Sequence, residues 1–483
     1  MKRAHRVSIA VTIALFLLAF PRQSHSQASD WRQVQAPPLR RFEPPVPKRA
    51  VLPNGMVLFF LEDRELPLIR LGIAFHGGSV SQPADKIGLV RIFGEVWRTG
   101  GTKSRTGDQL DDYLEARAAT VETNGWRDAI SVNLDCLKEN FPDVFKIFLE
   151  VLREPEFRED KIAIAKNQLN TSISRRNDNP FEIANREAAK LVYGVDSPYA
   201  RSAEYATVAS VTRNDLLNWY KQYVHPNNAM VTVIGDFDSK EMEARLRAAF
   251  ESWQRGPTFQ KPHFTFHDPK PGIYFVQKGD VTASTVQMID LGTTMDNPDY
   301  YAIEVFNQFF GGSLSSRLFS NIRSKKGLAY AVGGGIGTEY DHPGQINLFM
   351  GTKSATTAAA IDAFYEEVDA LKTNPVTPDE LRKAKEAILN SFVFRFDSKD
   401  KVMRARTDCE FFGYPLDFLL EKYRAGIEKV TQEDVARVAQ KYLHRERLAV
   451  LVVGKAADFD RPLSSFGQVR NVDISIPPPA GQK

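Results

Sequence analysis

Cysteine is almost absent from this chain, whose 483 residues include only Cys136 and Cys409. Two cysteines cannot build a disulfide framework, and they supply too few thiols for a zinc knuckle. One bridge is possible in an oxidising compartment. We expect instead that both cysteines are buried free thiols.

The sequence also lacks a strong charge imbalance. Its 63 basic and 60 acidic residues give a net charge of +3, and the basic residues are spread along the chain rather than clustered. This distribution gives no case for nucleic-acid binding. No segment after residue 20 is long and apolar enough to predict a membrane span.

The N-terminus has the pattern of a secretory signal peptide. Three basic residues precede an apolar run at residues 7–20, and the tripeptide SHS at residues 24–26 supplies a small-x-small cleavage site. The pattern predicts that residues 1–26 are removed and that the mature protein is periplasmic or secreted. The alternative is that the segment stays uncleaved as a membrane anchor. No cysteine lies near the cleavage site, so a lipid anchor is unsupported.

One sequence unit occurs twice. The segment VTRNDLLNWYKQYVHPNNAMVTVIGDF at residues 211–237 aligns without a gap with VTQEDVARVAQKYLHRERLAVLVVGKA at residues 430–456. The offset is constant, as His225 and His444 illustrate (444 − 225 = 219). A period this long indicates duplicated domains rather than a solenoid.

The domain boundaries follow from this duplication and from proline-rich segments at the ends and in the middle. We predict the following parts: a signal peptide at 1–26, a proline-rich arm at 27–47, an N-terminal half at 48–255, a linker at 256–272, a C-terminal half at 273–465 and a tail at 466–483.

Each half mixes strands and helices. VLPNGMVLFFLED at residues 51–63 predicts a strand, a tight turn and a strand, and the short β-rich run AMVTVIGDF at residues 229–237 predicts another strand. Residues 108–119 and 141–152 have helical apolar spacing. The fold class is therefore α+β, with two tandem homologous halves that each hold a mixed, mainly antiparallel sheet with helices packed on one face.

The histidines do not form an obvious metal site. His225 and His444 occupy equivalent places in the repeat and precede strands, so we expect structural roles for them. His263 and His267 lie four residues apart in the extended linker, where that spacing spans roughly 13 Å and is too far for one metal.

Four motifs occur in order along the chain. They are LPNGMVLFFLED, GGSVSQPADKIGL, GGTKSRT and, in the second copy, FNQFFGGSLSSRLFSNIRSKKGLAYAV. Together with the duplication, they resemble the pitrilysin/insulinase family of zinc peptidases, the inverzincins, over residues 48–460. The resemblance implies that the two halves form a clam-like chamber, and it implies metalloendopeptidase activity where the zinc site is intact.

Active members carry H-x-x-E-H on the helix that follows the Gly-Leu dipeptide. Its two histidines bind zinc from one helix face, its glutamate is the general base, and a glutamate about seventy residues later completes the ligands. In KIGLVRIFGEVWRTGGT, at residues 86–102, one alignment puts Arg91, Gly94 and Glu95 at the three positions; the other puts Ile92, Glu95 and Val96 there.

Neither alignment of the motif contains a histidine, so Glu95 is a degenerate remnant. A fixed guanidinium at Arg91 would also oppose a divalent cation. Ser172 and its neighbours replace the distal glutamate, since residues 167–177 offer no carboxylate before Asp178. We therefore predict no metal and no cofactor in this chain, with zinc only in a homologous partner.

The second copy keeps a different family feature. The resemblance implies that Arg323 and Tyr330, seven residues apart in IRSKKGLAY, face the substrate and hold its carbonyl. The alternative is an exposed arginine on a helix and a tyrosine packed after a turn. Arg317 is expected to be structural, and the glycines at 333–335 form a permissive loop.

The resulting hypothesis is a non-zinc, substrate-positioning subunit of a secreted heteromeric zinc peptidase that acts on peptides or unfolded segments. Its partner would be a homologous zinc-bearing subunit, and the chain alone would be inactive. The alternative is a non-catalytic scaffold or peptide-binding protein that reuses the fold. An autonomous hydrolase finds no support, because no G-x-S-x-G or papain-like cysteine motif is present.

Overall fold

The computed structural model describes residues 44–479 of the chain. The predicted signal peptide at residues 1–26 and most of the proline-rich arm lie outside these residues. Within residues 44–479, no helix combines the length and the apolar character that a bilayer span requires.

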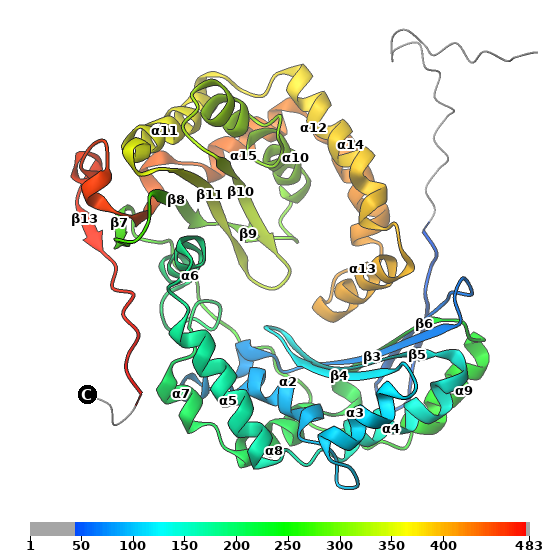
Figure 1. The fold of residues 1–483 in the computed structure, drawn as a ribbon. Helices are drawn as coiled ribbons and strands as arrows, with labels where there is room; N and C mark the ends of the chain where they lie inside the picture. Colours follow the sequence, from blue (N-terminus) through cyan, green and yellow to red (C-terminus); the bar gives the residue numbers. More distant parts are fainter. Residues whose placement is uncertain (1–43, 480–483) are drawn as a thin grey trace, which may run out of the picture. The chain divides into compact units, whose positions relative to one another are not determined.

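The N-terminal half is built on a six-stranded sheet with the order β1-β2-β6-β3-β5-β4 (Figure 1). Only β2 and β6 run parallel, and every other neighbouring pair is antiparallel. The strands are β1 Lys48–Val51, β2 Val57–Glu62, β3 Leu68–His76, β4 Thr120–Gly125, β5 Ala129–Leu137 and β6 Ala229–Gly235.

The C-terminal half repeats this arrangement. Its seven-stranded sheet has the order β13-β7-β12-β8-β11-β10-β9, in which β7-β12-β8-β11-β10 reproduces β2-β6-β3-β5-β4, parallel pair included. The duplication and the α+β class are thus confirmed. The strands are β7 Gly272–Gln277, β8 Ala283–Leu291, β9 Thr293–Thr294, β10 Ala331–Glu339, β11 Pro343–Lys353, β12 Ala449–Gly454 and β13 Val469–Asn471.

The predicted tail at residues 466–483 is partly inside the fold. Its strand β13 pairs in parallel with β7, and Val472 extends the contact by donating its backbone N–H to Phe275. Val472 and Ile474 then pack on the core of the second sheet, and Ile476 packs on the core of the N-terminal half. The tail therefore joins the two halves, because its alternating apolar side chains bury surface on both.

Helices cover one face of each sheet. In the N-terminal half they are α2 Leu89–Thr99, α3 Gly107–Glu115, α4 Phe141–Arg153, α5 Glu159–Ser174, α7 Tyr205–Ser210, α8 Arg213–Tyr223 and α9 Ser239–Phe250. In the C-terminal half they are α10 Tyr300–Phe310, α11 Thr357–Thr373, α12 Pro378–Ser391, α14 Tyr423–Lys429 and α15 Gln432–Tyr442. The N-terminal core is rich in aromatic rings, among them Phe93, Trp97 and Phe148, all fully buried.

The repeated helices α8 and α15 begin in the same way. Thr212 and Asp215 form a capping box at the start of α8, and Thr431 and Asp434 form the equivalent box on α15. Each box satisfies two backbone N–H groups that would otherwise lack partners in the first helical turn. The duplicated Val-Thr-x-x-Asp pattern thus fixes the same helix start in both copies.

Two further helices, α6 Pro180–Tyr193 and α13 Lys399–Phe412, are also equivalent by the 219-residue offset. Each packs on the second face of the other half's sheet. α6 contacts β8 and β12, and α13 contacts β2 and β6 (Figure 1). The helices on one face were predicted from sequence, and this reciprocal exchange adds a helix to the other face of each sheet.

Candidate functional site

The two possible alignments of the degenerate metal motif put different residues of α2 at the metal positions. These residues lie in different surroundings. Arg91 is exposed and Glu95 is half-buried, whereas Ile92 and Val96 are fully buried in the N-terminal core. The first alignment therefore has two side chains that reach beyond the core, those of Arg91 and Glu95, whereas the second has only that of Glu95.

Glu95 faces α5, the helix on which the distal glutamate of an active member is expected. In the amide orientation that satisfies both of its polar atoms, Gln168 donates to Glu95, with 2.5 Å between Gln168 Nε2 and Glu95 Oε1. Burial raises the pKa of Glu95, and the positive charge of Arg91 opposes this shift. The carboxylate of Glu95 thus accepts a hydrogen bond from a neutral amide and lies within the field of the Arg91 guanidinium.

Gly94 leaves no space for the general base of the family motif. A Cβ added to Gly94 would lie 2.1 Å from the backbone nitrogen of Gly125 on β4. Thr123 of the same strand donates its hydroxyl to the Gly94 carbonyl at 2.5 Å. The strand backbone therefore packs directly on α2 at the position where a glutamate would have to stand.

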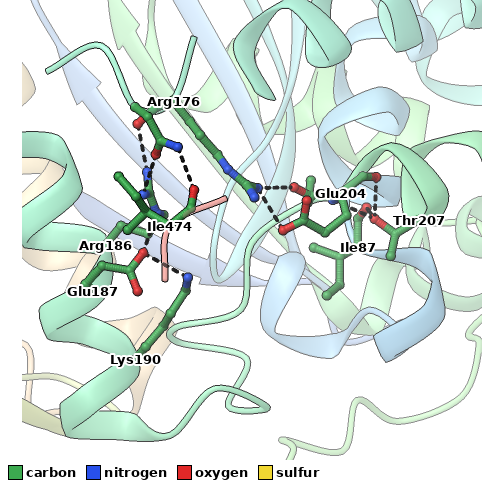
Figure 2. Close-up of polar contacts among 10 residues, drawn as sticks. Ile87, Arg176, Arg186, Glu187, Lys190, Glu204, Thr207 and Ile474 are labelled. Atoms are coloured by element: carbon green, nitrogen blue, oxygen red, sulfur yellow. Dashed lines mark hydrogen bonds and ion pairs between the residues drawn. The ribbon is translucent and has the colours of Figure 1, made fainter. Parts of the chain in front are cut away.

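The region of the distal ligand is also closed to metal binding. Ser172 is exposed, and its hydroxyl donates to the Gln168 carbonyl one turn earlier, 3.1 Å away. Beyond the end of α5, Arg176 pairs with Glu204 at 2.8 Å (Figure 2). Among residues 44–479, Glu95 belongs to no group of His, Cys, Asp and Glu side chains that could hold a metal ion, so the residues present do not fit a zinc ion.

A network of arginines instead fixes the turn between α5 and α6 (Figure 2). Arg186 donates to the carbonyl of Arg176 at 2.8 Å and to the side chain of Asn177 at 2.7 Å. Asn177 in turn donates to the Ile474 carbonyl at 2.6 Å, which attaches the C-terminal segment. This part of the degenerate site therefore has a structural role.

The rest of the described chain offers no replacement site. Within residues 44–479, no group of three or more His, Cys, Asp and Glu side chains is arranged to hold a metal ion. His225 and His444 both bond to a backbone carbonyl of the preceding helix, at 2.7 Å and 3.2 Å. His76 stacks on Phe411 with ring centroids 3.8 Å apart, and burial lowers its pKa to about 4.

The structure places Arg323 and Tyr330 on the C-terminal half, with both side chains exposed. Arg323 lies in the π-helical segment Phe319–Lys325, with its guanidinium 4.6 Å from the centroid of the Phe319 ring. Tyr330 is 60% exposed, and its backbone N–H donates to Gly351 of β11 at 3.0 Å. No hydrogen bond joins either side chain to another residue among 44–479, so their donors are available to a ligand.

Arg317 differs sharply from Arg323. It makes a two-pronged ion pair with Glu380, both bonds 2.7 Å long, and donates to the carbonyls of Asn374 and Pro375. These hydrogen bonds use the N–H groups of Arg317 that face α12, and they hold the start of that helix in place. Its surroundings are those of a structural residue.

One feature of the structure was missed from the sequence: a cavity of about 700 Å³ between the second face of the N-terminal sheet and α13. Part of its floor is made by alternate residues of β3, namely Arg70, Gly72 and Ala74, whose neighbours in the sequence point into the helix-covered core. The alternation of small or polar residues with apolar ones in LIRLGIAFH is the signal that marks this second face.

Two family models match the chain. "Insulinase (Peptidase family M16)" matches residues 61–194, and "Peptidase M16 inactive domain" matches residues 210–388. Among curated proteins, the chain is 22% identical to the non-peptidase homolog YmxG of Helicobacter pylori, over 75% of this chain and 83% of that one. It is 23% identical to the probable inactive metalloprotease YmfF of Bacillus subtilis, over 71% and 82% of the two chains.

Solved structures show the same fold. The crystal structure of a peptidase M16 inactive domain from Pseudomonas fluorescens superposes with a TM-score of 0.75 and 24% identity, covering 85% of this chain and 98% of that one. A protease from Helicobacter pylori superposes with a TM-score of 0.74 and 18% identity, covering 85% and 100%.

Proposed function

Because the chain belongs to the insulinase family, peptidase family M16, as an inactive homologue, we propose that it is the substrate-positioning subunit of a heteromeric zinc peptidase. Its partner is a homologous subunit with an intact H-x-x-E-H motif, which brings the zinc. The complex acts on peptides or unfolded segments. The predicted signal peptide supports a periplasmic or secreted complex.

The observation that carries this proposal is the contrast between the two halves. In the N-terminal half, Arg91 and Gly94 have replaced two of the motif residues, and packing against Gly125 closes the site. In the C-terminal half, Arg323 and Tyr330 are exposed, and the side chains of both make no hydrogen bond to another residue in the described part of the chain. A guanidinium and a phenol can donate to a substrate carbonyl and stabilise the oxyanion that forms on it.

The test is reconstitution with the zinc-bearing homologue of the same organism. The mixed complex should cleave an unstructured peptide faster than the zinc subunit alone. Arg323→Ala with Tyr330→Phe should lower kcat on the order of 100-fold while the complex still assembles. Arg382→Ala with Tyr301→Phe, two changes elsewhere on the C-terminal half, should leave kcat unchanged.

Two results would reject the proposal. One is a mixture that never assembles, or that cleaves no faster than the zinc subunit alone. The other is a complex in which the Arg323/Tyr330 variant retains full activity, since the chain would then act as a scaffold. N-terminal sequencing of the secreted protein tests its localisation, because cleavage after Ser26 leaves Gln27 as the first residue.

A further inference from the structure

The ring of Tyr330 lies directly against Gly351 of the neighbouring strand β11. A Cβ added to Gly351 would lie 2.3 Å from Cζ of Tyr330 and 2.5 Å from its phenol oxygen. Atoms that are not bonded or hydrogen-bonded to each other do not approach so closely. The Tyr330 ring therefore occupies this place on the strand only because residue 351 has no side chain.

The backbone around Tyr330 is tied to the same end of β11. Tyr330 donates its N–H to the Gly351 carbonyl at 3.0 Å, and Ala331 pairs with Gly351 in the β10–β11 ladder. The hydroxyl of Thr352, a fully buried residue, donates to the Leu328 carbonyl at 2.6 Å. Because the main chain is held on both sides of Tyr330, the room above Gly351 decides where its side chain lies.

The same support reaches Arg323. Leu328 donates its N–H to the Ile322 carbonyl at 3.1 Å, and Gly327 donates to the carbonyl of Arg323 at 3.2 Å. The end of β11 thus holds, through Leu328, the turn that joins the π-helical segment of Arg323 to Tyr330. The two members of the proposed substrate-positioning pair therefore share one support.

Gly351 lies on the sheet face that α6 covers in part. Its neighbour Met350 is fully buried in the core, so Phe349 and Gly351 point to the opposite face. The ring of Phe349 contacts the ring of Phe181 at the start of α6, with centroids 5.9 Å apart. Tyr330 therefore rests on the face of the C-terminal sheet to which the N-terminal half contributes a helix.

This arrangement is unusual for a side chain as exposed as that of Tyr330, which has 60% of its surface open to solvent. An exposed tyrosine ordinarily samples several rotamers, and a ligand that binds it must order it. Here one side of the ring rests on the backbone of β11. A donor that is already in place stabilises a developing oxyanion without this ordering cost.

We propose that Gly351 is a positioning residue for Tyr330: because it has no side chain, it lets the phenol lie where its hydroxyl can donate to a peptide carbonyl. This role of Gly351 rests on the function proposed above. It carries a requirement of its own, which is that the effect of Gly351 on activity passes entirely through the Tyr330 hydroxyl.

The geometry is tested on the full chain alone, by fluorine NMR with meta-fluorotyrosine at position 330. The native signal should differ in chemical shift from that of the chain unfolded in guanidinium chloride, because the ring is held against β11. Gly351→Ala should move the signal, since the exposed ring can swing outward while the fold is kept, as circular dichroism checks. Gly279→Ala should not move it, because the Cβ added there has no heavy atom of residues 44–479 within 4 Å apart from its own chain neighbours.

The role in activity is tested in the reconstituted complex by a double-mutant cycle. Gly351→Ala should lower kcat on the order of 10-fold, as expected for a misplaced donor. Tyr330→Phe should lower kcat as well, and adding Gly351→Ala to Tyr330→Phe should cause no further loss. A merely structural role of Gly351 would instead lower kcat by the same factor in both backgrounds.

Four results would overturn the proposal. They are a native signal at position 330 that coincides with the unfolded one, a signal that Gly351→Ala leaves unchanged, losses of kcat that multiply in the double variant, and a Gly351→Ala chain that fails to fold, which would assign the glycine a structural role. None of these results contradicts the proposed function, which requires only that Arg323 and Tyr330 contribute to kcat. If Tyr330→Phe has no effect on kcat, the role of the phenol in the proposed function fails, and the role of Gly351 fails with it.

Discussion

Gly94 of α2 and Gly125 of β4 pack backbone against backbone, so that a Cβ on Gly94 would lie 2.1 Å from the Gly125 nitrogen and one on Gly125 would lie 2.1 Å from the Val90 carbonyl oxygen. Two glycines facing each other let the helix approach the strand closely. The same contact fills the space that a catalytic glutamate would occupy. The tight packing of α2 on β4 therefore excludes the metal site.

Gly94→Ala should therefore destabilise the protein. An alanine inside a helix normally stabilises it by about 0.5–1 kcal/mol relative to glycine. Here we expect a loss of about 1–3 kcal/mol, because the methyl group overpacks the contact with β4. Urea unfolding measures the difference. The control is Gly279→Ala, where the added Cβ has no heavy atom of residues 44–479 within 4 Å apart from its own chain neighbours.

Rebuilding the motif should not rebuild the metal site. The triple change Arg91→His, Gly94→Glu and Glu95→His supplies H-x-x-E-H, but the glutamate at position 94 would clash with β4 and no distal carboxylate is present. We expect less than one zinc per ten chains after dialysis, by atomic absorption. Stoichiometric zinc in a folded variant would show that the strand can move aside.

The two cysteines should be inert in the native protein. Cys136 and Cys409 are buried free thiols, as expected from the sequence. Burial raises the pKa of Cys136 to about 12 and that of Cys409 to about 11, so little reactive thiolate exists at neutral pH. Ellman's reagent should label neither thiol in the folded protein and both in guanidinium chloride. Rapid native labelling would contradict this prediction.

The Arg317–Glu380 pair should make stability depend on acid pH. Burial alone would raise the pKa of Glu380, but hydrogen bonds from Arg317 and Thr377 outweigh it and lower the pKa from 4.5 to about 2. The ionised carboxylate therefore stabilises the fold above pH 4.5, and this contribution is lost as the pH falls towards 2.

Glu380→Gln should accordingly cost about 2 kcal/mol at pH 7, allowing for solvent screening of a partly exposed pair. The difference from the unmodified protein should shrink between pH 4.5 and pH 2, as measured by urea unfolding at each pH. Glu386→Gln is the control on the same helix, since its ion pair with Arg382 is more than half exposed on both sides. A difference that stays constant with pH would refute the assignment.

Glu187 should be the most sensitive member of the network in Figure 2. It is 3% exposed and accepts from Arg186 and Lys190, both at 2.9 Å. Glu187→Ala leaves two cations near the buried interface of α6 without their counterion, and should cost about 3 kcal/mol or more. Glu182→Ala, exposed on the same helix, should cost a few tenths of a kcal/mol at most. Equal effects in thermal unfolding would show that Glu187 is not a buried anchor.

The fold was largely predictable because its signals are local. The strand–turn–strand pattern at residues 51–63 predicted β1 and β2, the β-rich run at residues 229–237 predicted β6, and helical spacing predicted α3 and α4. The duplication was visible because both copies kept these local signals at one offset. The strand β13 was missed because three residues of a proline-rich tail form a strand only by pairing with β7.

The features of the candidate sites likewise include one that the sequence decides and several that depend on the tertiary structure. The absence of histidine in α2 was decided by the sequence alone, because no fold can supply a ligand that the chain does not encode. The exposed state of Arg323 and Tyr330, the Gly94–Gly125 contact and the cavity beneath α13 depend on residues between about thirty and more than three hundred positions apart. Only tertiary packing decides whether such residues meet, since their burial is set by which sheet face each helix covers and not by any local pattern.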